Sequence, residues 1–239
     1  MSLSSPLPEP TEKERFVHEM FDAIAPTYDL VNRLMTFGID QRWRARTLDA
    51  LALTPGASVL DLACGTGDFV RLAYKRGHFV IGVDFARQML VHSSDAAPRV
   101  QASALSLPFA DASFDAITCG FALRNFASIP EVYEEAARIL KPGGAFAVLE
   151  VSTPRSKILR TGHQWYFNRV VPQIGRVINA PAAYRYLPAS VAYLPSPHEL
   201  ARIAAGAGFA ILTQLPMFSG AAQLSLAVMP QPTREAGSR

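Results

Sequence analysis

A glycine-rich turn and the acid that follows it are the residues of this sequence best suited to chemistry. Residues 58–62 form a short apolar run of strand length, and the Gly65–Gly67 turn breaks it before a helix can begin at Asp68. Glycine lets the backbone turn sharply and lets a ligand approach main-chain N–H groups, while the helix start supplies further donors. Asp84 ends the next apolar run, at the spacing of the acid that binds ribose hydroxyls in nucleotide-binding βαβ units. These residues predict a site for an adenosine-containing cofactor.

The elements that position this turn alternate between strands and helices. Apolar runs predict strands at Ser58–Leu62, Phe79–Val83, Arg99–Ala102, Asp115–Gly120 and, after a sharp turn at Lys141–Gly144, Ala145–Val151. Helices are predicted at Asp68–Arg76, Ala86–Ser94, Pro130–Leu140 and His198–Ala207. Two final strands, Phe209–Leu215 and Gln223–Met229, lie close enough in sequence to pair as a hairpin. This alternation predicts an α/β protein with a mostly parallel, doubly wound sheet.

The remaining segments are expected to surround the sheet. Three helices are predicted before it: from a capping box at Thr11 to about Ala25, at Tyr28–Phe37 and at Asp40–Leu51. We therefore interpret residues 11–229 as one domain, with residues 11–54 as an N-terminal helical cap and residues 153–197 as an inserted lid. The Ser- and Pro-rich residues 1–10 and the tail at 230–239 are expected to be disordered.

Composition limits the class of protein. The chain has 239 residues, 49% hydrophobic and 18% charged, which suits a globular protein with a substantial core. It has no apolar run of the ~18–20 residues that span a membrane. Cys64 and Cys119 are too few for a disulfide framework. We therefore expect a protein of the reducing cytoplasm.

The identity of the cofactor depends on what surrounds the glycine turn. A dinucleotide fingerprint needs a third glycine, and its position here is Val70, so the turn by itself leaves NAD and S-adenosylmethionine open. The Thr66-Gly67-Asp68 step and the Ala102-Ser103-Ala104 step resemble the class I S-adenosylmethionine-dependent methyltransferases. That resemblance implies a Rossmann-like fold whose seven-stranded sheet ends in an antiparallel hairpin.

Four further motifs narrow the resemblance to one family. They are Tyr28-Asp29-x-x-Asn32, Leu123-Arg124-Asn125, the run from Arg138 through Glu150-Val151-Ser152, and Tyr186-Leu187-Pro188-Ala189-Ser190. Together they resemble the C-methyltransferases of menaquinone and ubiquinone biosynthesis. Asp40 departs from that pattern, because the family usually has His there, and the difference falls on the substrate side.

The resemblance implies an S-adenosylmethionine site, with no metal, at seven positions: Asp61, Gly65, Thr66, Gly67, Asp84, Ser103 and Ala104. The two glycines allow close approach, and Thr66 is expected to hydrogen-bond the methionine portion. Asp84 is expected to bind the ribose hydroxyls, with a helix cap as the structural alternative. Ser103 and Ala104 are expected to line the adenine edge. Asp61 binds the methionine amino group or ties neighbouring backbone donors, and the pattern leaves both open.

The acceptor chemistry points to Arg124, Tyr28 and Asp29. A ring carbon ortho to a hydroxyl attacks the methyl group, and it becomes a good nucleophile only when that hydroxyl loses its proton. Phenolic groups have a pKa of about 10, so a base or a positive charge must assist at neutral pH. Arg124 is expected to stabilise the oxyanion, with a structural ion pair as the alternative. Tyr28 and Asp29 are expected to bind or deprotonate the hydroxyl, with an N-cap role as the alternative for Asp29.

The segment between Val151 and His198 has six basic and six aromatic residues but no Asp or Glu. This composition suits transient contact with an anionic membrane surface, so we expect a peripheral location at its inner face. A solvated lid surface or a nucleic-acid face are the alternatives, and we expect no nucleic-acid partner.

The predicted reaction is C-methylation of demethylmenaquinol, a polyprenyl naphthoquinol, to menaquinol. C-methylation of 2-methoxy-6-polyprenyl-benzoquinol, or of another small molecule, is the alternative. Two other classes compete: an NAD-linked oxidoreductase, which Val70 disfavours, and a non-catalytic RNA-binding module, suggested only by the basic aromatic segment. The sequence leaves the oligomeric state open, with a homodimer as one option.

Overall fold

The computed structural model describes residues 12–93, 97–154, 156–170, 173, 186 and 189–231. Three helices open this part of the chain: α1 (Lys13–Ile24), α2 (Tyr28–Thr36) and α3 (Ile39–Ala50). Pro26 lies in a short 3-10 turn, Ala25–Thr27, between α1 and α2. The predicted capping residue Thr11 lies outside the described residues; Glu12 is the N-cap of α1 and makes no side-chain cap hydrogen bond.

Seven strands form one sheet, in the order β3-β2-β1-β4-β5-β7-β6. Their bounds are β1 Ser58–Leu62, β2 Phe79–Asp84, β3 Arg99–Gln101, β4 Phe114–Gly120, β5 Leu140–Val151, β6 Ile211–Met217 and β7 Ala222–Val228. The first five strands pair in parallel, while β7 is antiparallel to both β5 and β6. The seven-stranded sheet with a C-terminal antiparallel hairpin is confirmed.

The largest difference from the predicted strands is at the start of β5. It begins at Leu140, which pairs with Phe114, and regular pairing with β4 resumes only at Ala145. Between them Gly143 has a φ of +76°. The expected turn at 141–144 is therefore an irregularity inside a strand, because the residue before it already pairs with β4.

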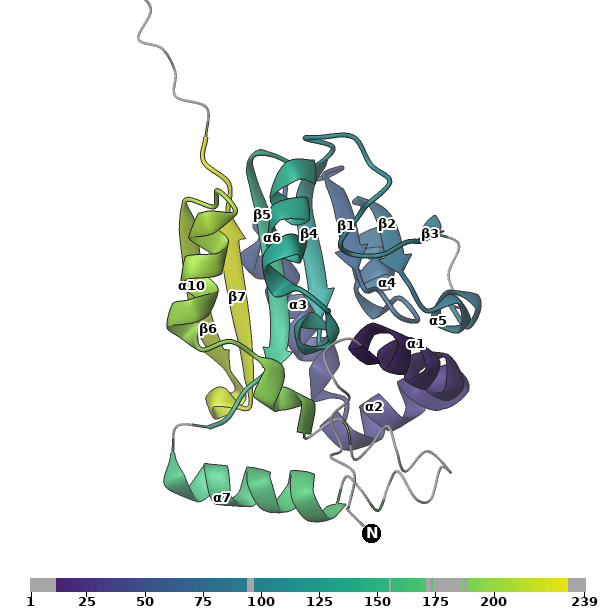
Figure 1. The fold of residues 1–239 in the computed structure, drawn as a ribbon, viewed down its shortest axis with the longest axis vertical. Coiled ribbons are helices and arrows are strands. Elements are labelled where there is room, and N and C mark those ends of the chain that lie inside the picture. The colour runs from purple at the N-terminus through teal and green to yellow at the C-terminus, as the bar shows by residue number, and fades with distance from the viewer. Residues whose placement is uncertain are drawn as a thin grey trace, which may run out of the picture.

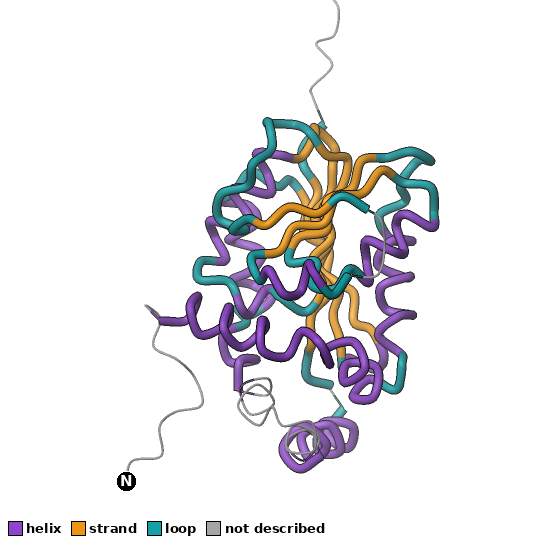
Figure 2. The backbone as a smooth tube through the Cα atoms, turned by 90° about the vertical axis from the view of Figure 1, so that its right-hand side faces the viewer, coloured by secondary structure: helices purple, strands orange, loops and turns teal. Residues whose placement is uncertain are grey.

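Helices cover both faces of the sheet (Figures 1 and 2). On one face, α6 (Ile129–Ile139) and α10 (Pro197–Gly206) pack around buried residues such as Tyr133 and Phe146. On the other, α3 and α4 (Asp68–Lys75) enclose a second apolar cluster with Phe69 and Leu149. The short helix α5 (Arg87–Val91) packs against α1. These helix layers hold the sheet on both sides and so fix the positions of the strand ends.

The N-terminal helices lie at the carboxyl ends of the parallel strands. In Figure 1, α1, α2 and α7 (Lys157–Trp165) stand below the tips of β4 and β5. A π-helical segment, η4 (Tyr166–Val170), follows α7, and short 3-10 turns occur at η3 (Leu123–Asn125), η5 (Val191–Tyr193) and η6 (Phe218–Gly220). None of the helices described here is long and apolar enough to cross a membrane.

Candidate active site

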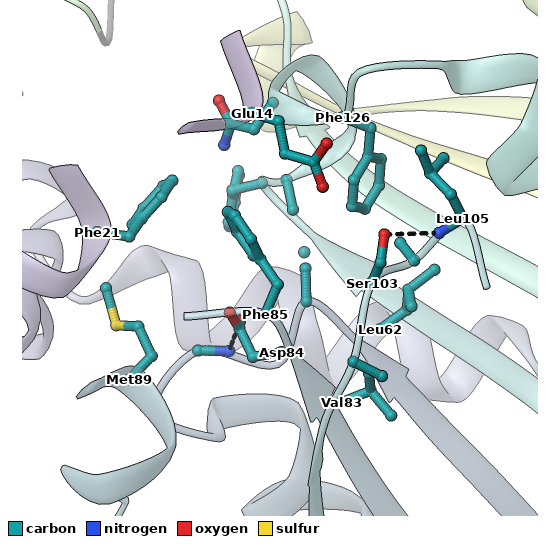
Figure 3. Close-up of a pocket in the computed structure, with 18 of the residues that line it drawn as sticks. Glu14, Phe21, Leu62, Val83, Asp84, Phe85, Met89, Ser103, Leu105 and Phe126 are labelled. Carbon is teal, nitrogen blue, oxygen red and sulfur yellow. Dashed lines mark hydrogen bonds between the residues drawn. The ribbon is translucent and has the colours of Figure 1, made fainter. Parts of the chain in front are cut away.

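The first cavity lies at the carboxyl ends of β1, β2 and β4. Gly65 and Gly67 have φ angles of +55° and +95°, which L side chains rarely adopt. Four of the predicted cofactor residues line the cavity: Gly65, Asp84, Ser103 and Ala104. Figure 3 shows Asp84 and Ser103 in its wall, with Glu14 of α1 at the top of the view. The cavity thus joins the glycine turn to the acid that ends β2.

Asp84 is held by main-chain donors. Its Oδ2 accepts a hydrogen bond from Gly65 N at 2.8 Å, and its Oδ1 accepts one from Ala86 N at 2.9 Å. Burial raises the pKa of this carboxyl to about 6, although the backbone hydrogen bonds oppose the shift. Ala86 is the N-cap of α5, and Asp84 bonds the N–H of that residue rather than an N–H of the helix itself, so it does not cap the helix. Ribose binding by Asp84 stays a prediction.

Three of the predicted cofactor residues do not line this cavity: Asp61, Thr66 and Gly67. Asp61 is buried, and its Oδ1 accepts a hydrogen bond from Thr118 Oγ1 at 2.8 Å. Burial raises the pKa of Asp61 to about 7. Thr66 donates its hydroxyl hydrogen bond to a neighbouring carboxylate, that of Asp29. The Thr66–Asp29 bond joins the glycine turn to α2, and the Asp61–Thr118 bond joins β1 to β4.

Asp29 lines neither of the cavities described here. Besides the bond from Thr66, its carboxylate lies 3.8 Å from Arg71 Nη2, and Arg71 Nη1 donates to the Thr66 carbonyl at 2.7 Å. The N-cap alternative for Asp29 is wrong, because α2 begins one residue earlier and Thr27 occupies its N-cap. In this structure Asp29 therefore clamps the glycine turn.

A second, larger cavity adjoins the first, with a volume of about 230 Å³ against about 70 Å³. Its wall comes from α1, α2 and α3, from the loop after β4, and from Tyr166, Tyr186 and Phe218. Most of the wall is apolar. Four residues line both cavities: Phe21, Tyr28, Phe121 and Asn125. A group bound in one cavity is therefore next to a group bound in the other, at the boundary that these four side chains form.

Arg124 lines the second cavity and is almost fully buried. Its Nη1 donates to Glu150 Oε1 and, at 2.9 Å, to the Phe121 carbonyl, while its Nε donates to Ser190 Oγ at 3.1 Å. Arg124 therefore does form a structural ion pair, with Glu150. The same ion pair holds its guanidinium group at the cavity wall. Glu150 and Ser190, which hold Arg124 in place, are both distant from it in sequence.

Tyr28 and Asn125 stand at the boundary between the cavities. Burial raises the pKa of Tyr28, while its hydrogen bond with Asn32 and the charges of Arg44 and Arg124 act in the opposite direction. Asn125 Oδ1 accepts a hydrogen bond from Tyr186 at 3.3 Å, whereas its buried Nδ2 has no partner among the described residues. A buried amide donor without a partner marks a place where a ligand atom can bind.

Comparison with known proteins gives this geometry its context. The profile of the ubiE/COQ5 methyltransferase family matches residues 10–228. The demethylmenaquinone methyltransferase of Roseiflexus sp. (strain RS-1) is 43% identical, over 91% of this chain and 95% of its own length. The corresponding enzyme of Thermus thermophilus is 42% identical, over 85% of this chain and 97% of its own. The chain belongs to the ubiE/COQ5 methyltransferase family. It is an S-adenosylmethionine-dependent C-methyltransferase of quinone biosynthesis.

Other family members are named for both quinones. The ubiquinone/menaquinone biosynthesis C-methyltransferase UbiE of Geotalea uraniireducens is 38% identical, over 89% of this chain and 95% of its own length. Solved structures of lower identity share the fold. Phosphoethanolamine N-methyltransferase 2 of Haemonchus contortus, in complex with S-adenosylmethionine, has a TM-score of 0.59 and 17% identity, covering 80% of this chain and 53% of that one.

The first cavity fits the family's cofactor. Its glycine turn leaves space beside Gly65, where an added Cβ would meet nothing nearer than Tyr28 at 3.8 Å. A buried carboxylate at Asp84 and the unpartnered Nδ2 of Asn125 offer an acceptor and a donor to a polar ligand. The described residues contain no cluster of His, Cys, Asp and Glu that could hold a metal ion.

Sequence reasoning missed several residues of these walls. Glu14, Phe85 and Phe121 line the first cavity, and Glu150 holds Arg124. Phe85 and Phe121 each come directly after a strand, so a search of all strand-end residues would have found them. Glu150 is the second-last residue of a buried apolar strand, where an acid is unfavourable unless it is paired, and that is the signal for a hidden partner.

Proposed function

We propose that this chain methylates the ring carbon of demethylmenaquinol, a polyprenyl naphthoquinol. The observation that supports the proposal most is the meeting of the two cavities across Phe21, Tyr28, Phe121 and Asn125. The cavity that holds Asp84 and the glycine turn adjoins a larger, more apolar one with room for a fused ring. The names of the Roseiflexus and Thermus relatives favour the naphthoquinol over the methoxy-benzoquinol, which is the alternative.

The cofactor supplies a methyl group activated by a sulfonium charge. The ring carbon would take that methyl as the carbon–sulfur bond breaks. The hydroxyl's proton would leave to solvent and the carbon's hydrogen would return to the oxygen, so that one proton is released for each methyl transferred. Arg124 holds the oxygen ortho to this carbon as it becomes an oxyanion, in a cavity where exclusion of water strengthens the interaction. Tyr28 binds the same oxygen as a donor, because its raised pKa keeps its hydroxyl protonated at neutral pH. Asn125 positions the ring between them.

The predicted cofactor residues divide by their place in the structure. Asp84 would accept hydrogen bonds from the ribose hydroxyls, and Ser103 and Ala104 would border the adenine. Thr66 and Asp29 would hold the turn at Gly65 and Gly67 in its left-handed geometry through their mutual hydrogen bond. Asp61 would join β1 to β4 through its hydrogen bond with Thr118.

A transient contact with a membrane surface would deliver the quinol to the second cavity. Helix α7 carries exposed Ile158 and Trp165 together with Lys157 and Arg160. This mixture of apolar and basic residues suits an anionic interface. Tyr166, which follows α7, lines the second cavity and donates a hydrogen bond to the Met35 carbonyl at 2.9 Å. Residues 153–197 would therefore serve as the lid, and residues 11–54 as the helical cap. Flotation with anionic liposomes at low salt tests this contact, and no retention would contradict it.

The substrate is tested by offering both reduced quinols side by side with labelled S-adenosylmethionine. We expect methylation of demethylmenaquinol with a kcat/KM at least about tenfold above that of the methoxy-benzoquinol, equivalent to ~1.4 kcal/mol. Each quinol should share the same prenyl tail length, so that tail binding cancels. Methylation of the benzoquinol alone would overturn the naphthoquinol proposal.

A further inference from the structure

The second cavity contains a buried ion pair that the proposed chemistry does not use. Asp40 and Arg44, four residues apart on α3, both line this cavity and are only 1% and 5% exposed. Arg44 Nη1 lies 2.5 Å from Asp40 Oδ2. Thr36 Oγ1 and Gln41 Nε2 also donate to the Asp40 carboxylate, at 2.8 and 3.1 Å. A carboxylate has about four lone-pair sites, so Asp40 can accept a further hydrogen bond beside those from Arg44, Thr36 and Gln41.

Arg44 retains one unused donor. Its Nη2 lies 3.5 Å from Asp68 Oδ2, and its guanidinium carbon lies 5.6 and 5.3 Å from the ring centres of Phe69 and Phe121. Its Nε–H is buried and has no hydrogen-bond partner among the residues that the structure describes. An unpaired buried N–H is unfavourable, so a cavity residue that keeps one is suited to a ligand oxygen.

The two arginines of the cavity are linked through one residue. Phe121 contacts Arg44 at its ring and accepts a hydrogen bond from Arg124 at its carbonyl. Phe121 also has a φ of +60°, a conformation that is unfavourable for a non-glycine residue and is often stored at functional sites. The charges of both arginines act on the pKa of Tyr28, after burial and its hydrogen bond with Asn32. Arg44 and Arg124 therefore approach Phe121 at different places, Arg44 at its ring and Arg124 at its carbonyl.

We propose that the Asp40–Arg44 pair binds the second hydroxyl of the quinol, on the opposite side of the ring from the oxygen held by Arg124. This inference rests on the proposed function, because a quinol is the acceptor that carries two oxygens across one ring. The Asp40 carboxylate accepts the hydroxyl's proton in a hydrogen bond, and Arg44 Nε donates to its oxygen. The pair therefore recognises a hydroxyl and disfavours the carbonyl of an oxidised quinone, which has no proton to offer Asp40.

The experiment compares two acceptors in each protein. One is the prenyl naphthoquinol; the other is a prenyl naphthol that keeps the hydroxyl ortho to the accepting carbon and lacks the one across the ring. In the unaltered protein we expect kcat/KM to favour the quinol by at least about 100-fold, because the pair is left unsatisfied by the naphthol. In Arg44→Met the ratio should be lower than in the unaltered protein by at least about tenfold. Intrinsic reactivity cancels, since both proteins meet the same two compounds.

Two further variants keep the test decisive. Asp40→Asn retains the shape of the pair and replaces one acceptor by an amide donor, so the oxidised quinone should inhibit it more strongly than the unaltered protein. Arg138→Met is the matched control: Arg138 on α6 is hydrogen-bonded to Glu135 and Asp111 and lines neither cavity, so its ratio should be unchanged. Calorimetric binding of S-adenosylmethionine checks that each variant is folded.

The outcomes separate the two proposals. If the unaltered protein methylates the naphthoquinol and the ratio is the same in Arg44→Met and Asp40→Asn, the inference is overturned while the proposed function stands. If the unaltered protein methylates neither naphthalene compound, both fail together. A fall in the ratio, with unchanged cofactor affinity, supports the inference.

Discussion

The two cavities are built in different ways. The wall of the first comes mainly from residues 62–127, at the ends of neighbouring parallel strands, and its central carboxylate at Asp84 is held by main-chain N–H groups. The wall of the second comes from segments between Met20 and Ala221. Its polar groups are held by side-chain ion pairs, Arg124 with Glu150 and Arg44 with Asp40.

Because of this difference, we expect the two cavities to respond differently to substitution. Main-chain donors survive any change of side chain, so the first cavity depends on the fold more than on particular neighbours. A buried ion pair loses its geometry when one partner is removed, and the remaining charge is left uncompensated. We therefore expect cofactor binding to tolerate changes that abolish turnover.

The strongest test of this separation is Arg124→Ala. We expect kcat to fall by about 10²–10³-fold, since the developing oxyanion loses its donor in a water-poor cavity. Affinity for S-adenosylmethionine should change little, because Arg124 does not line the first cavity. Steady-state kinetics measure the first quantity and calorimetry the second. Unchanged turnover would remove Arg124 from the proposed mechanism, and lost cofactor binding would show that the cavities are not independent.

The next test concerns Asp61, the buried carboxyl group on β1. An unfolded Asp loses its proton near pH 4, whereas Asp61 in the folded protein keeps it to about pH 7. The folded state therefore binds more protons in between, and Asp61 lowers the free energy of unfolding as pH rises through this window. Asp61→Asn should remove that loss, which is on the order of 4 kcal/mol at pH 8 and absent near pH 3.

Denaturant unfolding without cofactor, at pH values from about 4 to 8, measures this difference. The comparison uses the gap between the two proteins, so that other titrating groups cancel. The hydrogen bond from Thr118 survives in the variant, since an amide oxygen also accepts. A gap that does not change with pH would contradict the account of Asp61.

A milder change acts on the second cavity through a positioning residue. Glu150→Gln keeps the size of the side chain and an acceptor for Arg124, but it removes the charge that fixes the guanidinium. We expect kcat to fall by about tenfold with little change in KM for the quinol, because binding remains and alignment is lost. Glu150→Asp, which restores the charge, should recover part of the rate. A rise in KM alone would assign Glu150 to substrate binding instead.

The smallest effect is expected at the mouth of the second cavity. Phe37 lines this cavity although it is 79% exposed. Phe37→Ala should raise KM for a long-tailed quinol by about threefold and leave KM for a short-tailed one unchanged, because only the tail reaches the mouth. Phe79→Ala is the control, since Phe79 is 76% exposed and lines neither cavity. An equal rise in KM for the long-tailed and the short-tailed quinol would contradict a role of Phe37 in binding the tail.

The contrast between the cavities also explains what could be predicted from sequence. Gly65 and Asp84 were found because the strand–turn–helix pattern is local, and strand ends of a parallel sheet meet at one edge. The seven-stranded sheet with its terminal antiparallel hairpin followed from the family resemblance, and the sheet topology confirms it. Start positions were less accurate: β5 begins five residues before the predicted strand, because Leu140 pairs with Phe114.

The partners of the predicted catalytic residues could not be predicted in this way. Arg124 was identified, but Glu150 and Ser190, which hold it, are 26 and 66 residues away in sequence. Asp29 was assigned to the acceptor, whereas its carboxylate binds Thr66, 37 residues away, and lines neither cavity. Pairs of this kind arise from tertiary packing and leave no periodic signal. Asp40 was placed on the substrate side, and the structure puts it in the wall of the second cavity.

The position of β7 has a consequence for how the protein is made. Because β7 lies between β5 and β6, the buried edge of β5 has no neighbour until residues 222–228 have left the ribosome. A nascent chain held at that stage exposes an apolar strand edge, which is where a chaperone would act and where chains would aggregate. Phe218 and Ala221 complete the second cavity only then. The growing polypeptide thus contains the strands of its methyl-donor cavity well before it has a place for the acceptor.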